Sequence, residues 1–510
     1  MLESLVKKSD IKFLKYKFFI NRALTYFSFL LIPVWLQETL KFNLFTQANI
    51  LLMYMIFMAG QWYLFGKEID HRLKIFYKVT SSLDRIVYRL FLGSTILIIL
   101  FNFIGLFSEN IWKYFFWTFF ACIGIFYSWP TRGKIIEDSV SFQLGEFRFL
   151  DSFEKTVVFF SIFTFFISLP EIPMFENIEA LKLYFDPSEK VSAIFWRALE
   201  ITYSPFKNYP KLYNLIWSLH FYFLGTGVFL IAFYAVTRQL FSRRLAFLGV
   251  FAVLSTWSFT RILSEDYLSG LSTTYSLILL WSFLWSLQSG TYRSGLIVGL
   301  VSFYGVILNP LNFFYIPVIL CFQYFIFMKE QTTWFKKQWL KYTLLGVVLS
   351  LLVFLTNLEK IQFDFLNFTF LKLHILDLVS RKAFFVIAPF GLCYLFLSKS
   401  KSYSFLVDQA GFNHERVKQI NLMILTIFLF GIIINPYFIS GFNLIWPLVL
   451  YALIPLDRIF HSISKQRSRR NIIYTLYILV CLMDSQLENR IRIVAKMFLD
   501  SESYKFLIQL

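Results

Sequence analysis

The sequence predicts an all-α, polytopic membrane protein with about 14 transmembrane helices. Of its 510 residues, 57% are hydrophobic and only 16% are charged, a balance that the core of a soluble protein could not hide. Apolar runs near the ~20 residues that cross a hydrocarbon layer recur along the chain, as at 50–66, 91–107 and 268–287. These runs are continuous rather than alternating, so the pattern favours helices over barrel strands.

The net charge of +18 comes mainly from the short connections between these runs. Basic short loops mark the cytoplasmic side of a membrane protein, and this distribution argues against nucleic acid as a partner. The loops predicted on that side are 67–89, 132–155, 238–244, 292–293, 329–341, 399–418 and 465–470. The opposite side is expected to hold 37–47, 108–110, 169–210, 261–267, 309–312, 357–382 and a short turn near Gly441.

The N-terminus carries lysines and Arg22 ahead of an apolar run, without a small-residue cleavage site. We therefore expect an uncleaved first membrane helix, with the N-terminus in the cytoplasm, in a bacterial inner (plasma) membrane protein. The four cysteines lie inside apolar segments at spacings unlike those of metal ligands. They are expected to be core thiols, with neither a disulfide framework nor a zinc site.

Three parts follow from the spacing of the apolar runs. Residues 1–150 are expected to form two N-terminal hairpins with about four helices. Residues 151–485 are expected to form the main membrane domain, which contains the long outer loop 169–210 and in which a further apolar run at 474–483 is too short to count as a span. Residues 486–510 form a short C-terminal tail. Long loops beside membrane helices tend to carry function, so the outer loop is the first place to search.

The outer loop is acidic, and on the simplest interpretation it is a solvated loop. A sharper interpretation comes from order and spacing. Asp186 and Glu189 precede a segment at 191–199 whose apolar residues recur at three and four, which predicts an amphipathic helix on the membrane surface. A Tyr-Pro-rich re-entry at 208–213 follows, then a tight basic turn at 238–246. A second acidic pair, Glu265 and Asp266, returns to the outer face.

In this order the motifs resemble those of the GT-C superfamily of membrane glycosyltransferases, which includes protein mannosyltransferases and aminoarabinose transferases. The resemblance covers about residues 155–330. Asp186 and Glu189 with the surface helix resemble the family's acidic first-loop motif and jaw helix, and 208–213 resembles its Pro-Pro-Leu-Tyr re-entry. The turn at 238–246 is similar to its Arg-Arg-Ala turn, and 295–310 to the helix that comes later.

The resemblance implies transfer of a sugar from a polyprenyl-phosphate carrier at the non-cytoplasmic face. A carboxylate must then accept the proton of the attacking hydroxyl, and cations must stabilise the departing phosphate. The residues in these roles would be Asp186 or Glu189 as the base, Glu265, Asp266 and Glu176 for positioning the acceptor or a divalent metal, and Arg261, Arg381 and Lys382 for the lipid phosphate. No other cofactor is implied, and the partners would be membrane lipid and the lipid-linked donor.

Two alternatives stand beside this interpretation. The Asp-Glu dipeptide of the family is split here, and the lysine often found near Asn309 is missing, so the chain could be a non-catalytic membrane scaffold or transport component with the same fold. Fragments at 65–72 and 126–134 also resemble UbiA-type prenyltransferases, of whose metal cluster only Glu68 and Asp70 remain. His220 is the one histidine near the outer site, and a hydrogen-bonded histidine inside the bundle is its simpler interpretation.

Overall fold

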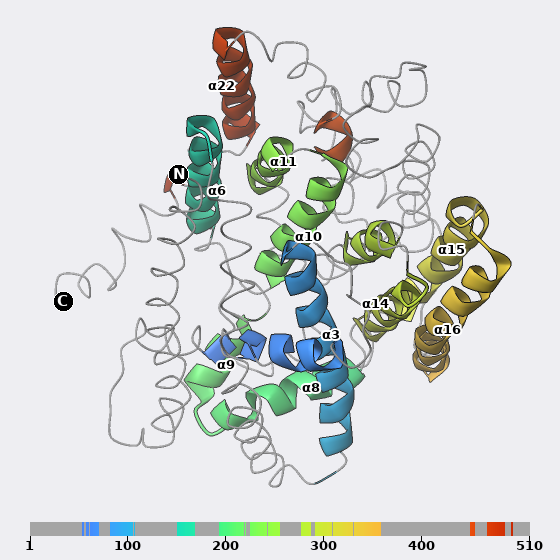
Figure 1. Cartoon of the computed structure of the whole chain (residues 1–510). Coiled ribbons are helices and arrows are strands. Elements are labelled where there is room, and N and C mark those ends of the chain that lie inside the picture. The colour runs from blue at the N-terminus through green and yellow to red at the C-terminus, as the bar shows by residue number, and fades with distance from the viewer. Residues whose placement is uncertain are drawn as a thin grey trace, which may run out of the picture. The chain divides into compact units, whose positions relative to one another are not determined.

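The fold is described from a computed structural model (Figure 1). The described residues are 54–55, 58–60, 62–70, 82–105, 107, 150–168, 193–218, 220, 225–241, 243–255, 277–286, 291–308, 310–329, 331–356, 358, 449–453, 467–484 and 491–492. Within them every regular element is a helix. They fall into two compact units, the first with the described residues of 54–107 and 193–220, the second with those of 150–168 and 225–492.

The first unit contains a close antiparallel pair made by helical residues 62–70 and α3 (Ser82–Ile104). Glycines allow the close approach: a Cβ added at Gly66 would collide with the backbone of Arg89, and one at Gly93 with the backbone of Trp62. Small residues of this kind bring membrane helices together. Arg89 Nε also pairs with Asp70 Oδ2 at 3.2 Å, so the charges at this end of the pair are balanced.

Three short elements complete the described part of the first unit: α8 (Ala193–Tyr203), the 3₁₀ helix η5 (Ser204–Phe206) and α9 (Pro210–Ser218). α8 packs against α3, and Gly105 at the end of α3 lies under the side chains of Arg197 and Ile201. The amphipathic pattern at 191–199 therefore does form a helix. Its apolar face is covered by protein, since Trp196, Leu199 and Ile201 are all buried.

The second unit contains a parallel pair, α6 (Ser152–Ser168) and α11 (Arg243–Ser255), and α10 (Gly225–Leu240) runs antiparallel to α11. Gly249 of α11 lies close to Phe233 of α10, so the turn between α10 and α11 is tight, as its sequence predicts. α22 (Arg467–Asp484) also packs on α11, where the Tyr477 hydroxyl donates to the Leu248 carbonyl at 3.4 Å.

A second group in this unit is built on α14 and α16, which lie side by side in Figure 1. A Cβ at Gly299 would lie 2.6 Å from the Thr343 carbonyl oxygen, and one at Gly346 would collide with Gly299 itself. A Cβ at Gly295 would likewise lie against the carbonyl of Trp339. Because the contacts 295 with 339 and 299 with 343 advance in the same direction along both helices, α14 and α16 run parallel. The elements in chain order are α14 (Ser294–Leu308), the 3₁₀ helix η7 (Pro310–Phe314), α15 (Tyr315–Cys321), the π-helical segment η8 (Phe322–Phe327) and α16 (Thr333–Thr356).

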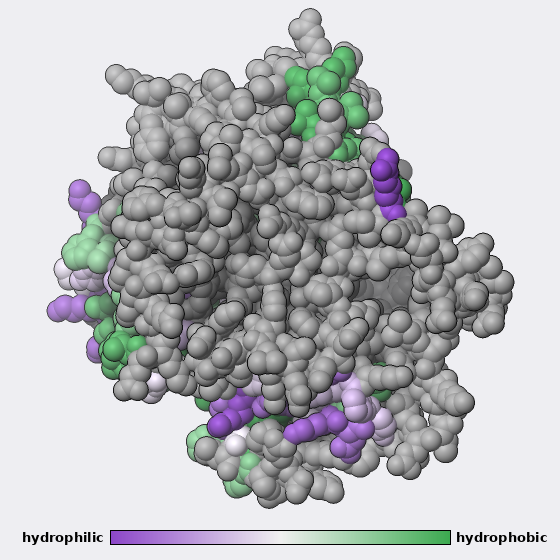
Figure 2. Space-filling view, turned by 180° about the vertical axis from the view of Figure 1, so that it is seen from behind, coloured by the Kyte–Doolittle hydropathy of each residue, from purple (hydrophilic) through white to green (hydrophobic). Residues whose placement is uncertain are grey.

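Two of the described helices, at Leu83–Ile104 and Thr333–Thr356, are long and apolar enough to cross a membrane. Both carry exposed apolar side chains, such as Phe103 on α3 and Leu345 on α16. α22 does so as well, and Figure 2 shows its hydrophobic residues as a green patch at the upper right. The other spans of the expected 14 stay a prediction, as do the boundaries of the three sequence parts.

Several sequence expectations are corrected in detail. The segment 329–341 is not wholly a loop, because α16 already begins at Thr333. The short run at 474–483 lies inside a longer helix, α22, which starts at Arg467. Of the two described cysteines, Cys481 is buried as expected, but Cys321 is exposed and is not a core thiol.

Candidate functional site

The residues assigned to the outer site lie outside the described residues. The structure therefore does not place them. They are Asp186, Glu189, Glu176, Glu265, Asp266, Arg261, Arg381 and Lys382. What the structure does describe is α8, the helix that begins shortly after Glu189, together with the elements that hold it.

Aromatic side chains fix α8 against α9 within the first unit. The rings of Trp196 and Trp217 stack with centroids 4.7 Å apart and planes 24° apart. The indole N–H of Trp196 donates to Glu200 Oε1 at 3.0 Å, so the polar edge of this buried ring is satisfied one turn along the same helix. This packing fixes the orientation of α8. It also fixes the position of the first turn of α8, which the acidic segment precedes in the sequence.

His220 belongs to a buried polar group at the end of α8. Its Nδ1 shares a hydrogen bond with the hydroxyl of Tyr203, and the hydroxyl of Tyr54 donates to the Thr202 carbonyl at 2.5 Å. Burial raises the pKa of the Tyr203 hydroxyl above its ordinary value, so this phenol stays neutral. His220 is thus hydrogen-bonded inside the protein, which was its simpler interpretation, and the group joins Tyr54 to α8.

Arg197 is the one exposed cation of α8 with a described environment. Its aliphatic stem lies over Gly105, where an added Cβ would be 2.5 Å from the Arg197 Cδ. Only a glycine leaves room for the stem at this point, and Arg197 as a whole is exposed. Arg197 therefore places a positive charge beside the last turn of α3, where a cation is favourable to the helix dipole.

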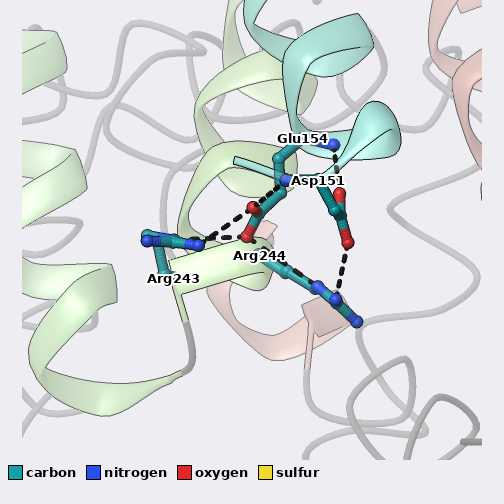
Figure 3. Close-up of polar contacts among 4 residues, drawn as sticks. All are labelled: Asp151, Glu154, Arg243 and Arg244. Atoms are coloured by element: carbon teal, nitrogen blue, oxygen red, sulfur yellow. Dashed lines mark hydrogen bonds and ion pairs between the residues drawn. The ribbon is translucent and has the colours of Figure 1, made fainter. Parts of the chain in front are cut away.

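A cluster of four charged residues joins α6 to α11 in the second unit (Figure 3). Arg243 makes two bonds to Glu154, from Nε to Oε1 at 3.2 Å and from Nη2 to Oε2 at 3.0 Å. Arg244 Nη2 contacts Asp151 Oδ2 at 2.5 Å. Asp151 and Glu154 also cap α6 reciprocally, since each backbone N–H donates to the other's carboxylate, at 3.0 and 2.7 Å.

This cluster serves structure rather than catalysis. The Glu154 side chain is 3% exposed, and its carboxylate is held by a two-pronged guanidinium and by the capping bond. A carboxylate bonded in this way is not available as a base. The capping half of the cluster could have been predicted from the spacing Asp151-x-x-Glu154, but the pairing of Glu154 with Arg243, 89 residues later in the chain, could not.

Asp70, one of the two acidic residues of the UbiA-like fragment, is likewise in an ion pair. Its carboxylate accepts from both Nε and Nη2 of Arg89 at 3.2 Å, and Arg89 also donates to the Tyr63 hydroxyl at 2.9 Å. The side chain of Asp70 is 5% exposed. This carboxylate stabilises the close pair of helices and is not presented to a metal-bound diphosphate.

Among the described residues, no group of three or more His, Cys, Asp or Glu side chains could hold a metal ion. The divalent metal considered for the outer site would depend on carboxylates that lie outside these residues. When the chain was compared with family models, with curated proteins and with solved structures, none of the three comparisons gave a match.

Proposed function

We propose that the chain is an integral membrane glycosyltransferase of the GT-C type, which transfers a sugar from a polyprenyl-phosphate carrier to an acceptor at the non-cytoplasmic face. One observation carries this proposal. α6, α8, α9, α10 and α11 lie in the ranges at which the resembling motifs require helices and a tight basic turn. The element α8 in particular starts directly after the acidic segment that would supply the base.

A membrane domain of about 14 helices is part of the proposal. Its support is the alternation of helix direction in the α14–α16 group. Tyr292, before α14, contacts Trp334 at the start of α16, with ring centroids 5.4 Å apart. Phe313 of η7 stacks on Phe354 near the other end of α16, at 4.8 Å. Successive connections therefore lie at opposite ends, as the predicted sides of 292–293, 309–312 and 329–341 require.

Contacts elsewhere agree with the same scheme. The contact between Glu154 and Arg243 brings the first residues of α6 and α11 together. This agrees with the prediction that the connections before these two helices lie on the same side of the membrane. In the first unit, Gly105 at the end of α3 and Tyr54 near the start of the preceding helix both contact α8. These are the ends that the sequence assigns to the non-cytoplasmic side.

The proposed chemistry needs one proton acceptor and several cations. Asp186 or Glu189 would take the proton from the acceptor hydroxyl as its oxygen attacks the anomeric carbon, while the bond from that carbon to the phosphate oxygen breaks. Arg261, Arg381 and Lys382 would hold the negative charge on the departing lipid phosphate. Glu265, Asp266 and Glu176 would position the acceptor or a divalent metal.

The test is a transfer assay with the full chain in membranes, supplied with radiolabelled polyprenyl-phosphate sugars. Asp186→Asn or Glu189→Gln should lower transfer by about 10²-fold or more, because general-base catalysis contributes 10²–10⁴. Glu179→Gln is the matched control, since it removes a carboxylate from the same loop that has no assigned role. Full activity in both Asp186→Asn and Glu189→Gln would refute the assignment of the base.

The second candidate is a non-catalytic scaffold or transport component. Two buried carboxylates among the described residues, those of Asp70 and Glu154, form ion pairs that hold helices together. This use of carboxylates is expected of a helical bundle with a purely structural role. A wild-type chain that inserts and folds but transfers none of the supplied sugars would favour this candidate.

A further inference from the structure

We propose that the start of α16 forms a binding surface for anionic phospholipid headgroups. This surface, here named the lysine end, consists of Lys329, Lys336, Lys337 and Lys341. The proposal rests on the membrane part of the proposed function and does not depend on sugar transfer. It concerns a surface of the second unit that the glycosyltransferase scheme does not use.

The charge of the lysine end is not balanced by protein groups in the described part of the chain. Lys329, Lys337 and Lys341 are exposed, and none of the four ammonium groups has a carboxylate of the described residues within ion-pair distance. The sequence from 329 to 358 contains a single acidic residue, Glu330, against four lysines. A concentrated positive charge of this kind is complementary to an anionic surface.

Aromatic side chains surround the lysine end. Tyr292 contacts Trp334, Phe335 and Tyr342, with ring centroids 5.4, 6.3 and 5.8 Å away. The ammonium of Lys336 lies 5.7 Å from the centroid of the Tyr324 ring. Trp and Tyr concentrate where a membrane protein meets the headgroup layer, because their rings are apolar and their N–H and O–H groups are polar.

An exposed apolar stripe begins immediately beyond the last lysine. It consists of Leu344, Leu345, Val348, Leu351, Leu352 and Leu355, which are between 39% and 58% exposed. Figure 2 shows hydrophilic and hydrophobic residues next to one another at its left edge, which corresponds after the half-turn to the right side of Figure 1, where α15 and α16 lie. Lysines interspersed with aromatic rings thus come first along α16, and exposed apolar side chains follow, in the order of headgroup region and acyl chain in a phospholipid.

This order distinguishes a lipid from other polyanions. A nucleic acid would need a polar surface that continues along its phosphate backbone, whereas the lysine end adjoins apolar side chains. The surface is also held rigidly. Trp339 is completely buried, and its indole N–H donates to Ser286 Oγ at 3.2 Å, so the part of α16 that carries the lysines is anchored to the helical residues 277–286.

One lysine, Lys336, lies in the first turn of α16, where the helix alone would not favour it. α16 has no acidic residue in its first turn, and the positive end of the helix dipole lies there. Cations near this end are unfavourable for an isolated helix. A headgroup phosphate reverses the effect, because its negative charge is attracted both by the ammonium groups and by the dipole.

The experiment measures which lipid stays with the protein. The full chain is reconstituted in vesicles of equal parts phosphatidylcholine and phosphatidylglycerol, extracted in mild detergent, and examined by native mass spectrometry. We expect the wild type to retain phosphatidylglycerol. K337Q/K341Q should weaken this retention roughly 30-fold, at about 1 kcal/mol for each lysine near an anionic surface.

Two further variants make the result decisive. K155Q/K207Q removes two exposed lysines elsewhere and should retain phosphatidylglycerol as the wild type does. K337R/K341R preserves the charge and should also retain it, which separates loss of charge from loss of fold. Equal retention by K337Q/K341Q and wild type overturns the proposal. If the wild type retains phosphatidylglycerol but transfers none of the supplied sugars, the scaffold candidate is favoured over the glycosyltransferase and the lipid surface stands.

Discussion

At the scale of single residues, Ser286 is the centre of a buried hydrogen-bond network. Its hydroxyl oxygen accepts from Gln323 Nε2 at 3.0 Å and from the indole of Trp339 at 3.2 Å. It lies 2.8 Å from Ser294 Oγ, which in turn donates to the Thr291 carbonyl at 2.6 Å. With two donors bound, Ser286 must give its own proton to Ser294, so the direction of every bond in the network is fixed.

Replacing Ser286 with alanine should destabilise the second unit by about 1–3 kcal/mol, because the Gln323 and Trp339 donors then have no acceptor in the interior. The measurement is the thermal unfolding midpoint of the detergent-solubilised chain, followed by circular dichroism.

Ser282→Ala is the matched control for this substitution. Ser282 is completely buried on the same helix, but its hydroxyl donates only to the Leu279 carbonyl one turn earlier, at 2.8 Å. Its loss leaves no donor unpaired, so the midpoint should fall by much less. Equal losses for the two serines would mean that the network contributes nothing beyond the volume of a hydroxyl.

At the scale of helices, the close contact between α14 and α16 depends on glycine. The spacing Gly295-x-x-x-Gly299 gives α14 a smooth strip, and Gly346 meets that strip from α16. Because membrane helices gain little from the hydrophobic effect when they associate, close backbone packing supplies much of the attraction between them.

Gly346→Ala should therefore destabilise the chain, by about 1–3 kcal/mol, since the added methyl group collides with the backbone of Gly299 and the helices must separate. Gly227→Ala in α10 is the control, because nothing lies within 4 Å of the methyl group it adds. It should be neutral or slightly stabilising, as alanine is the better helix former. Thermal unfolding of both variants gives the comparison, and equal effects would argue against a tight α14–α16 contact.

Local pattern predicted several elements well. The resemblance at 295–310 predicted α14, and the three-and-four spacing at 191–199 predicted α8. The start of α16 was missed because its lysines are typical of a loop, whereas in the structure they project from the first turns of a helix that is anchored by Trp339. Contacts such as Arg243 with Glu154 join distant segments, and no local pattern contains that information.

At the scale of the whole molecule, the roles assigned to the outer carboxylates stay predictions, while the alternation of helix ends within each unit can be tested on described residues. Gln331 and Leu358 are both exposed and lie at the two ends of α16. A helix of 24 residues is about 36 Å long, which exceeds the ~30 Å of a hydrocarbon layer. If α16 crosses the membrane, its ends must meet different aqueous compartments.

Single cysteines at these positions, with the four native cysteines replaced by alanine, test this with a membrane-impermeant maleimide. Leu358→Cys should react in intact cells, and Gln331→Cys only in inside-out vesicles, because basic segments stay in the cytoplasm. Arg293→Cys should behave as Gln331→Cys does, since the neighbouring Tyr292 contacts Trp334. Labelling of both ends from one side would show that α16 does not span the bilayer, and the lipid surface and the outer-face site would lose their common foundation.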